Sequence, residues 1–133
     1  MANRHGGFEA NYQTRAPRTL CLKITSTGTT GAQTLSNTGP FNLGIFEVNN
    51  TTTGTYIIRP GGNKQQVDPY AFLSGVSFVA DETDLYLDYY ADDIQSKTDP
   101  TVTLYLSDNA VSAKDLSNTK IAWITLHFLD SLD

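Results

Sequence analysis

The sequence has little of the side-chain chemistry on which most enzymes and metal proteins depend. It contains one cysteine, Cys21, and two histidines, His5 and His127, in 133 residues. A single cysteine excludes an internal disulfide framework, and a chain of this length can fold without disulfides or metals. Zinc and iron–sulfur sites lack ligands, and no G-x-S-x-G elbow supports nucleophilic catalysis. We therefore predict a protein that is not an enzyme, with no catalytic residues and no cofactor.

Cys21 and His127 both fall in predicted strands. Cys21 alternates with Leu20 and Leu22, which predicts a half-buried thiol, and nothing nearby in the sequence supplies a base to activate it. His127 lies beside Thr125 in the period of a strand. We interpret this histidine as a half-exposed strand residue rather than a catalytic base.

Long apolar runs are also absent. No segment approaches the roughly 18 apolar residues of a membrane span, and the N-terminus (MANRHGGFEANYQ) lacks the apolar core of a signal peptide. We expect a protein that is made in a cytoplasm and has no membrane partner. Only 17% of residues are charged and 39% hydrophobic, and Thr, Ser, Asn and Gly fill the difference. These residue types suit strand surfaces and turns, so the composition favours an all-β domain.

Charge is unevenly spread along the chain. Residues 1–23 carry four basic side chains and one acidic side chain, a net charge of +3. Residues 24–133 carry five basic and thirteen acidic side chains, a net charge of −8. The acidic part repels nucleic acid, and the basic part is too weakly charged to be a nucleic-acid tail. We therefore expect no nucleic-acid partner.

Residues 72–90 (FLSGVSFVADETDLYLDYY) are predicted to organise the fold as two strands joined by the acidic turn Asp81–Asp84. In the second strand Leu85, Leu87 and Tyr89 fall on one face. Tyr86, Asp88 and Tyr90 are assigned to the other face. This two-residue period is typical of a strand with one buried face. We interpret the two strands as a hairpin.

The same period predicts further strands. The run Phe41–Asn49 switches the side of its apolar residues, which indicates either a bulge near Gly44 or burial on both faces. A short helix is predicted only over Asp108–Asn118. The other predicted strands are Arg18–Ser26, a short one around Gln33–Ser36, Thr55–Arg59, and two that could pair with the hairpin, Thr101–Leu106 and Lys120–Leu129. The residues predicted to point inward from them include Leu20, Leu22, Ile24, Val102, Leu104, Leu106, Ile124, Leu126 and Phe128.

The sequence thus predicts about seven to nine short strands with turn residues between them. The fold class that follows is all-β, an antiparallel β-sandwich or jelly-roll-like barrel. This domain is assigned to residues 18–133. An extended N-terminal arm, residues 1–17, precedes it.

The arm has no hydrophobic period, so it has no means of folding alone. One interpretation is a disordered terminus. The other is a segment that orders against a neighbouring subunit through its isolated aromatic and arginine side chains, because these residue types dominate interface energetics. The predicted partner-binding residues are Arg4, Phe8, Tyr12, Arg15 and Arg18.

Acidic and aromatic residues leave three further possibilities. Calcium takes six to eight oxygen ligands, which acidic loops at one end of a sandwich can supply, although solvated turns are the simpler interpretation and we predict no metal site. A carboxylate pair for glycoside hydrolysis stays open, because the separation of the groups is not visible in a sequence. Outward aromatic residues would suit a sugar platform, a protein contact or packing along strands. The residues concerned are Asp81, Glu82 and Asp84 in one loop, Asp92, Asp93 and Asp99 in another, and the aromatics Tyr56, Tyr86, Tyr90, Tyr105 and Trp123.

The start without a signal, the short arm, the β body rich in Thr, Asn and Gly, the low lysine content and the lack of a catalytic constellation together resemble small virion proteins of tailed bacteriophages. Head decoration or cement proteins are the most similar type. The resemblance implies a β-sandwich or jelly-roll-like body, often a trimer, on the capsid exterior. Its partners would be the major capsid protein or other virion subunits. The alternative function is a carbohydrate-binding, lectin-like module, with or without a dependence on calcium.

Overall fold

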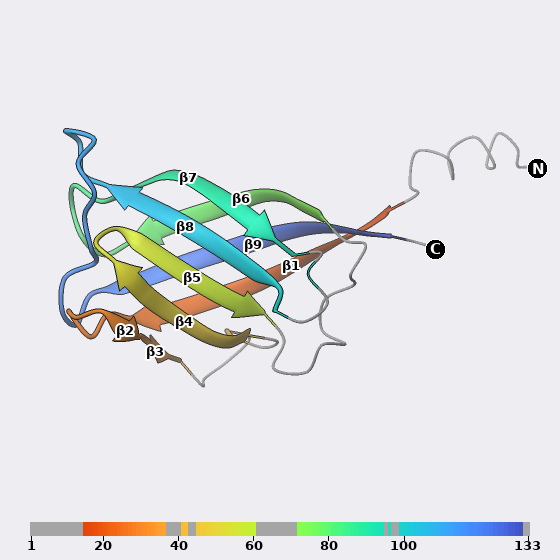
Figure 1. Cartoon of the computed structure of the whole chain (residues 1–133), viewed down its shortest axis with the longest axis horizontal. Coiled ribbons are helices and arrows are strands. Elements are labelled where there is room, and N and C mark those ends of the chain that lie inside the picture. The colour runs from red at the N-terminus through yellow and green to blue at the C-terminus, as the bar shows by residue number, and fades with distance from the viewer. Residues whose placement is uncertain are drawn as a thin grey trace, which may run out of the picture.

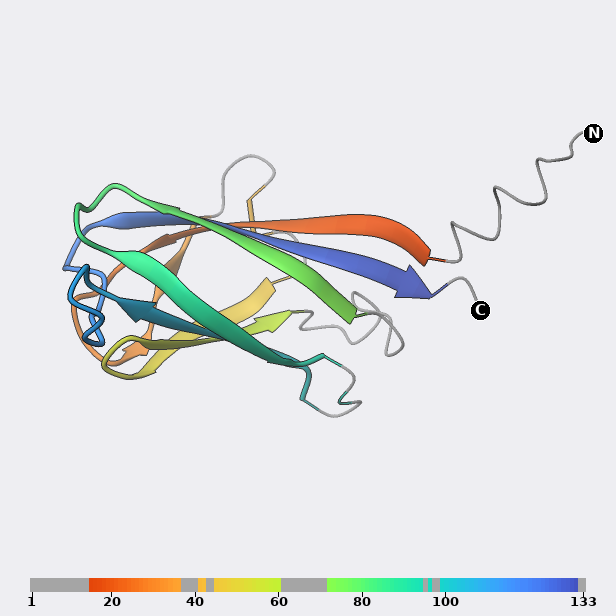
Figure 2. The ribbon, with the colours of Figure 1, turned by 90° about the horizontal axis from the view of Figure 1, so that it is seen from above.

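The chain folds into two β-sheets that pack face to face (Figures 1 and 2). The computed structural model describes residues 15–36, 41–42, 45–60, 72–94, 96 and 99–131. Within these ranges the chain forms nine strands and no helix. The strands are β1 (Arg15–Thr25), β2 (Gly31–Ala32), β3 (Thr34–Leu35), β4 (Ile45–Thr52), β5 (Thr55–Pro60), β6 (Phe72–Ala80), β7 (Tyr86–Asp93), β8 (Thr101–Ser107) and β9 (Ile121–Ser131).

All strand pairings are antiparallel. The four-stranded sheet has the order β3-β1-β9-β6, and the five-stranded sheet has the order β2-β4-β5-β8-β7. The predicted fold class, an all-β antiparallel sandwich, is therefore confirmed. The predicted strand Thr55–Arg59 and the turn before it are confirmed as well, since β4 and β5 form a hairpin around Thr53 and Gly54.

The predicted hairpin over residues 72–90 is wrong. Strand β6 pairs with β9 in the four-stranded sheet, whereas β7 pairs with β8 in the five-stranded sheet. Residues 81–85 therefore cross from one sheet to the other, and we call this connection the arch. Alternation of apolar residues shows that a strand has one buried face but does not show which strand lies beside it. Two such strands can bury these faces against each other across the core as readily as side by side.

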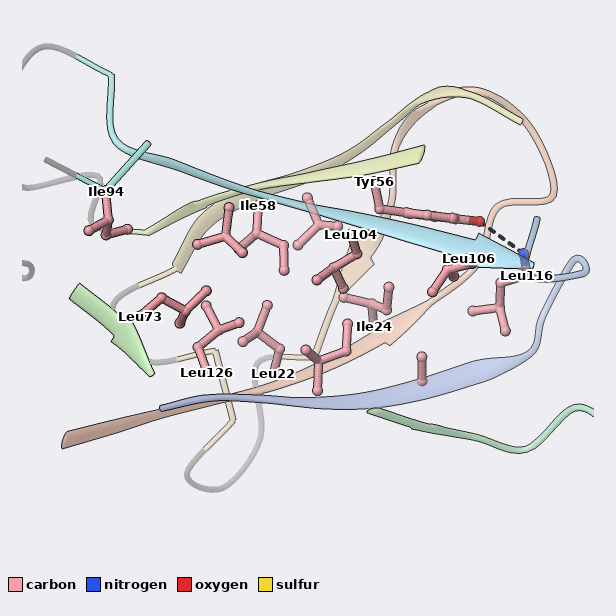
Figure 3. Close-up of a cluster of buried hydrophobic side chains, with 14 of the residues drawn as sticks. Leu22, Ile24, Tyr56, Ile58, Leu73, Ile94, Leu104, Leu106, Leu116 and Leu126 are labelled. Carbon is pink, nitrogen blue, oxygen red and sulfur yellow. Dashed lines mark hydrogen bonds between the residues drawn. The ribbon is translucent and has the colours of Figure 1, made fainter. Parts of the chain in front are cut away.

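The core lies between the sheets and consists of the inward residues of both (Figure 3). The predicted inward residues of β1, β8 and β9 are confirmed, since all are buried or pack against the buried cluster. Two core residues were not predicted, Ile94 and Leu116, which are each 1% exposed. Both lie in connections rather than strands, where no period marks them. Ile94 closes the core just after β7, and Leu116 closes it in the loop before β9.

The described strand pairings contain four register shifts, in β4, β6 and β7, and two of these bear on the predictions. The register of β4 against β5 shifts between Ile45 and Glu47, which confirms a bulge close to Gly44, although Gly44 itself lies outside the described residues. The register of β7 against β8 shifts between Leu87 and Tyr89. This second bulge was not predicted. It turns Tyr89 outward and Tyr90 toward the core, so the predicted assignment of these two faces is wrong beyond Leu87.

Strand β1 begins at Arg15, three residues before the predicted domain boundary. It pairs with β9 without interruption from Arg15 opposite Ser131 to Thr25 opposite Ile121, and this ribbon projects beyond β6 at one end of the sandwich (Figure 2). Pro17 fits within it because the odd-numbered residues of β1 aim their backbone groups away from β9. The Cys21 carbonyl, for example, accepts the Asn42 amide. The missing N–H of Pro17 therefore costs no bond to β9.

The helix predicted over Asp108–Asn118 is wrong as well. The Asp108 carboxylate accepts hydrogen bonds from the amides of Ala110 and Ser112, at 2.9 Å each. Such local bonds from a side chain to the backbone compete with helix formation. The segment forms tight turns instead. The short strand predicted around Gln33–Ser36 is present as β3, whereas β2 was not predicted; β2 and β3 belong to different sheets, and the buried Gln33 lies between them.

Candidate functional site

The predicted partner-binding residues lie at the N-terminal end of the chain. Arg4, Phe8 and Tyr12 fall outside the described residues. Arg15 and Arg18 belong to β1, where their backbones pair with Ser131 and Phe128 of β9. The projecting end of the β1–β9 ribbon is thus the part of the described structure that follows residues 1–14 in the chain.

The carboxylates of the arch accept hydrogen bonds from backbone amides of the loop before β9 and of the first residue of β9. Asp81 accepts the Ile121 amide at 2.7 Å. Glu82 accepts both the amide and the hydroxyl of Ser117. Asp84 accepts the Asn109 amide at 2.7 Å. These bonds join the arch to residues 108–121.

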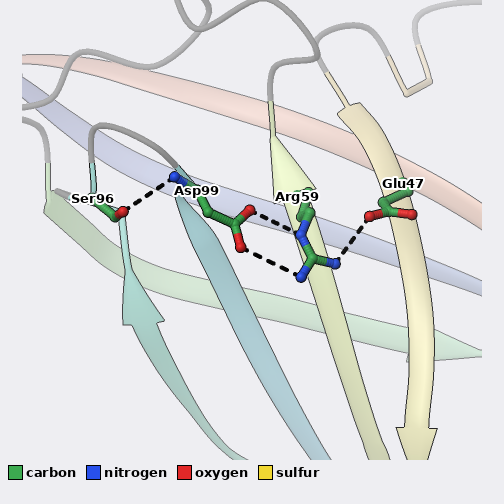
Figure 4. A network of polar contacts seen from close by, with 4 residues as sticks. All are labelled: Glu47, Arg59, Ser96 and Asp99. Atoms are coloured by element: carbon green, nitrogen blue, oxygen red, sulfur yellow. Dashed lines mark hydrogen bonds and ion pairs between the residues drawn. The ribbon is translucent and has the colours of Figure 1, made fainter.

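The second predicted acidic group is not gathered into one site. Asp99 pairs with Arg59 at 2.9 Å, and Arg59 also reaches Glu47 at 3.0 Å (Figure 4). The hydrogen bond that the Arg59 guanidinium donates to Asp99 raises the pKa of Arg59 above its usual value. Asp92 and Asp93 are exposed at the end of β7. Within the ranges that the structure describes, three or more metal-ligating side chains nowhere come close enough to hold an ion.

His127 lies on the outer face of the four-stranded sheet and is half-buried, as predicted. Its Nε2 is 3.0 Å from the Ser77 hydroxyl on the neighbouring strand β6. Ser77 is exposed, so this pair is accessible to solvent. The predicted half-burial of Cys21 is confirmed on the same face.

The five aromatic residues considered for a platform do not form one surface. Tyr56 is buried in the core, and its hydroxyl accepts the Leu116 amide at 2.9 Å (Figure 3). Tyr90 packs against the core, and Trp123 belongs to the other sheet. Only Tyr86 and Tyr105 remain on the outer side of the five-stranded sheet. Of the possibilities left open for these five residues, one shared platform is therefore excluded, and packing within the fold accounts for Tyr56 and Tyr90.

A smaller aromatic surface is present and includes a residue that was not predicted. Tyr89 stacks on Tyr105 of the adjacent strand, with ring centroids 4.2 Å apart and planes 15° apart. Tyr89 is 55% exposed. The bulge at Asp88 causes this, because it places Tyr89 opposite Tyr105 and turns it outward. A bulge that contains no glycine and does not change the phase of the apolar pattern cannot be recognised from the sequence.

An open hollow of about 190 Å³ adjoins the tyrosine pair. Its walls come from the β4–β5 turn, the end of β8, the bulge of β7 and the turn after β8. The lining includes Thr53, Thr55, Asp88, Tyr89, Tyr105 and Val111. Four separate segments thus meet at one end of the five-stranded sheet, and we take this hollow as the candidate site.

Buried polar bonds hold the floor of the hollow in place. Gly54 adopts a φ of 75°, and its amide donates to the Asp115 carboxylate at 2.6 Å. Asp115 also accepts from the side chain of Asn50, which is buried. A Cβ added to Gly54 would lie 2.6 Å from the Leu106 carbonyl oxygen, so only glycine fits there. The turn that forms one wall is therefore fixed rather than adaptable.

Comparison with known protein families, with curated proteins and with solved structures finds no match for this chain. The part of the chain that the structure describes contains no helix of the length and apolarity that crossing a membrane requires. The site must therefore be interpreted from its own geometry.

Proposed function

We propose that the protein is a structural component of a virus particle, a decoration or cement protein that binds the capsid exterior and stabilises the shell through protein contacts. The observation that carries this proposal is the β1–β9 ribbon. It projects past β6 at one end of the sandwich, and residues 1–14 precede Arg15, the first residue of this ribbon. A compact body with a strand pair that projects at one end suits a subunit that contacts a neighbour there.

The chemistry of the N-terminal segment supports the same function. Residues 1–14 contain Arg4, Phe8 and Tyr12 among small and polar residues. Aromatic and arginine side chains are those that most often dominate a protein interface. Repetition of a modest contact over many sites on a shell would give strong attachment through avidity. The partners under this proposal are the major capsid protein or other virion subunits, and the free protein forms a trimer.

The virion proposal is tested on particles purified by density gradient from cultures that carry the encoding genome. We expect the intact chain to co-purify in many copies per particle. A version that lacks residues 1–14 keeps all of β1 and should fold normally, yet it should be lost from the particles. A matched control, His5→Ala with Gln13→Ala, changes the same segment without its anchors and should remain bound. Absence of the intact chain from purified particles would refute the proposal.

The trimer is tested separately by light scattering on size-exclusion eluates, with calcium and with chelator. We expect a trimer in both conditions and a smaller species after removal of residues 1–14. The substitution Phe8→Ala with Tyr12→Ala should give the same dissociation. A full-length protein that is monomeric in both conditions would contradict the trimer but not the attachment to particles.

A carbohydrate-binding module is the second candidate function, and the hollow beside Tyr105 favours it. Aromatic rings next to hydroxyl and carboxylate groups are typical of sites that bind polar ligands with apolar faces. The carboxylates of the arch already accept bonds from backbone amides, which favours binding without calcium. Under this candidate, glycan binding would persist in chelator and after removal of residues 1–14.

A further inference from the structure

The hollow at the end of the five-stranded sheet has a wall of two aromatic rings that project from the sheet. Neighbouring strands lie about 4.8 Å apart, and the rings of Tyr89 and Tyr105 are nearly parallel with centroids 4.2 Å apart. The stacking direction therefore runs from strand to strand, and both rings project from the sheet. One face of Tyr105 is covered by Tyr89. The pair forms a rigid apolar wall with polar groups on either side.

Val111 supplies apolar surface from the opposite segment and is held there in an unfavourable conformation. Its φ is 67°, which is rare for a β-branched residue, and its side chain is 73% exposed. The tight turn that holds it is closed by Asp108, whose backbone carbonyl accepts the Val111 amide at 3.0 Å. Strained residues of this kind are enriched at ligand sites, although Thr119 adopts the same conformation away from the hollow. What singles out Val111 is its place in the lining, where its exposed side chain faces the space beside the tyrosine pair.

Polar groups complete the hollow. The hydroxyls of Thr53 and Thr55 and the exposed carboxylate of Asp88 belong to its lining. A carboxylate accepts hydrogen bonds from hydroxyl groups and repels anions. The nearby Lys114 directs its ammonium to the carbonyls of Thr83 and Asp84. The charge around the hollow therefore favours a ligand that is neutral and rich in hydroxyl groups.

The size of the hollow limits the ligand further. About 190 Å³ is below the roughly 300–1,000 Å³ of sites that enclose a drug-sized molecule. The space suits one six-membered ring, and the hollow is open, so a longer chain could continue outward. A pyranose has these features, since its ring has an apolar face and carries hydroxyl groups at its edge.

We propose that this hollow binds a single pyranose ring of a neutral saccharide. The ring would pack against the tyrosine wall and Val111, and its hydroxyl groups would bond to Asp88 and the two threonines. This inference rests on the carbohydrate-binding candidate and is independent of attachment to particles. A saccharide site on the body and an assembly segment at the N-terminus can occur in one chain.

The test is a titration of the ¹⁵N-labelled full-length protein with methyl glycosides of glucose, mannose, galactose and N-acetylglucosamine at millimolar concentration. We expect saturable amide shifts at Thr55, Tyr89 and Tyr105 with at least one of them. The anionic sugar N-acetylneuraminic acid should give none. The substitution Tyr89→Ala should weaken binding by about tenfold, because it removes half of the stacked wall. The matched control Tyr86→Ala removes a tyrosine of similar exposure (54%) that does not line the hollow, and it should leave binding unchanged.

A second variant keeps the proposal falsifiable if Tyr89→Ala disturbs the fold. Val111→Gly relieves the strain at that position, so it should raise the melting temperature while it weakens saccharide binding. A valine with only a structural role would not give these opposite effects. The proposal is overturned if no neutral glycoside shifts the amides of the hollow, or if a peptide of residues 1–14 shifts them instead. Neither result would change whether the intact chain co-purifies with particles.

Discussion

Two groups of acidic residues look alike in the sequence and differ in the structure. Both groups contain three acidic residues that fall between predicted strands: the arch group is Asp81, Glu82 and Asp84, and the β7–β8 group is Asp92, Asp93 and Asp99. Every carboxylate of the arch group accepts a backbone amide from residues 108–121. In the β7–β8 group only Asp99 has a described side-chain partner, and that partner is the guanidinium of Arg59.

The difference follows from what each group faces. The arch crosses between the sheets beside the amides of Asn109, Ser117 and Ile121, and an ionised carboxylate is a strong acceptor for such amides. The acids at the end of β7 belong to an edge strand and face solvent. A carboxylate in a turn thus stabilises the fold when a backbone amide without another acceptor lies opposite it. Otherwise it contributes only to the surface charge.

The largest expected effect is the loss of the arch bonds. Replacement of Asp81 and Glu82 together by alanine should lower the free energy of unfolding by about 2–4 kcal/mol. The reason is that charge-assisted bonds contribute about 1.5–3 kcal/mol each, and part of this is regained from water at a partly exposed site. Urea unfolding followed by circular dichroism measures the change.

The matched control replaces Asp92 and Asp93 together by alanine. It makes the same change in net charge, and we expect a stability within about 0.5 kcal/mol of the original, as for other exposed sites. Equal losses in the two double variants would show that net charge, rather than the bonds to backbone amides, governs stability. The comparison would then be wrong.

Tyr56 sharpens the comparison, because it holds the same loop from the core side with an uncharged acceptor. Its hydroxyl accepts the Leu116 amide at 2.9 Å in a buried setting. Tyr56→Phe leaves that amide without its acceptor and should cost about 1–2 kcal/mol. Leu116→Ala, which creates a cavity but keeps the hydrogen bond, should cost more, about 2–3 kcal/mol, in the same urea experiment. A Tyr56→Phe protein as stable as the original would show that this hydrogen bond does not contribute to holding the loop.

Tyr56 also gives a pH dependence. Burial raises the pKa of Tyr56 above its ordinary value of 10.0, and the bond from Leu116 offsets this only in part. The folded state therefore keeps this proton more tightly than the unfolded state, so the contribution is complete below about pH 10 and is lost as the pH rises above it. Between about pH 8 and about pH 10.5, the urea midpoint should fall less for Tyr56→Phe than for the original protein. Equal falls would contradict the assignment.

The fold class and most of the core could be predicted from the sequence, whereas the arrangement of strands could not. Alternation in Leu20–Ile24 and Ile124–Phe128 identifies inward faces because the side-chain period of a strand is fixed. It carries no information on the partner strand, and so β6 and β7 were paired with each other although they lie in different sheets. Ile94 and Leu116 were missed because single apolar residues in loops have no period.

The candidate site depends on features that a sequence does not display. Tyr89 was assigned to the inward face, since the bulge at Asp88 lies within a regular alternation. Tyr56 was counted as a surface aromatic, although its hydroxyl has a partner 60 residues away in the core. The turn with Val111 was predicted as part of a helix. Each error concerns a long-range contact or a local bond to the backbone that overrides the period.

The smallest expected effect tests the one pair in the β7–β8 group. Asp99 is 58% exposed on its side chain, and its bond to Arg59 lies at the surface, where an ion pair contributes about 0–1 kcal/mol. Asp99→Asn should therefore lower stability by at most about 0.5 kcal/mol relative to Asp93→Asn, which makes the same charge change without a described partner. This difference should vanish in about 1 M salt, which screens exposed charges over a few ångströms. A larger loss that persists in salt would mean that Asp99 orders its loop through the backbone, since its amide donates a hydrogen bond to the Ser96 hydroxyl. Asp99 would then resemble the arch acids.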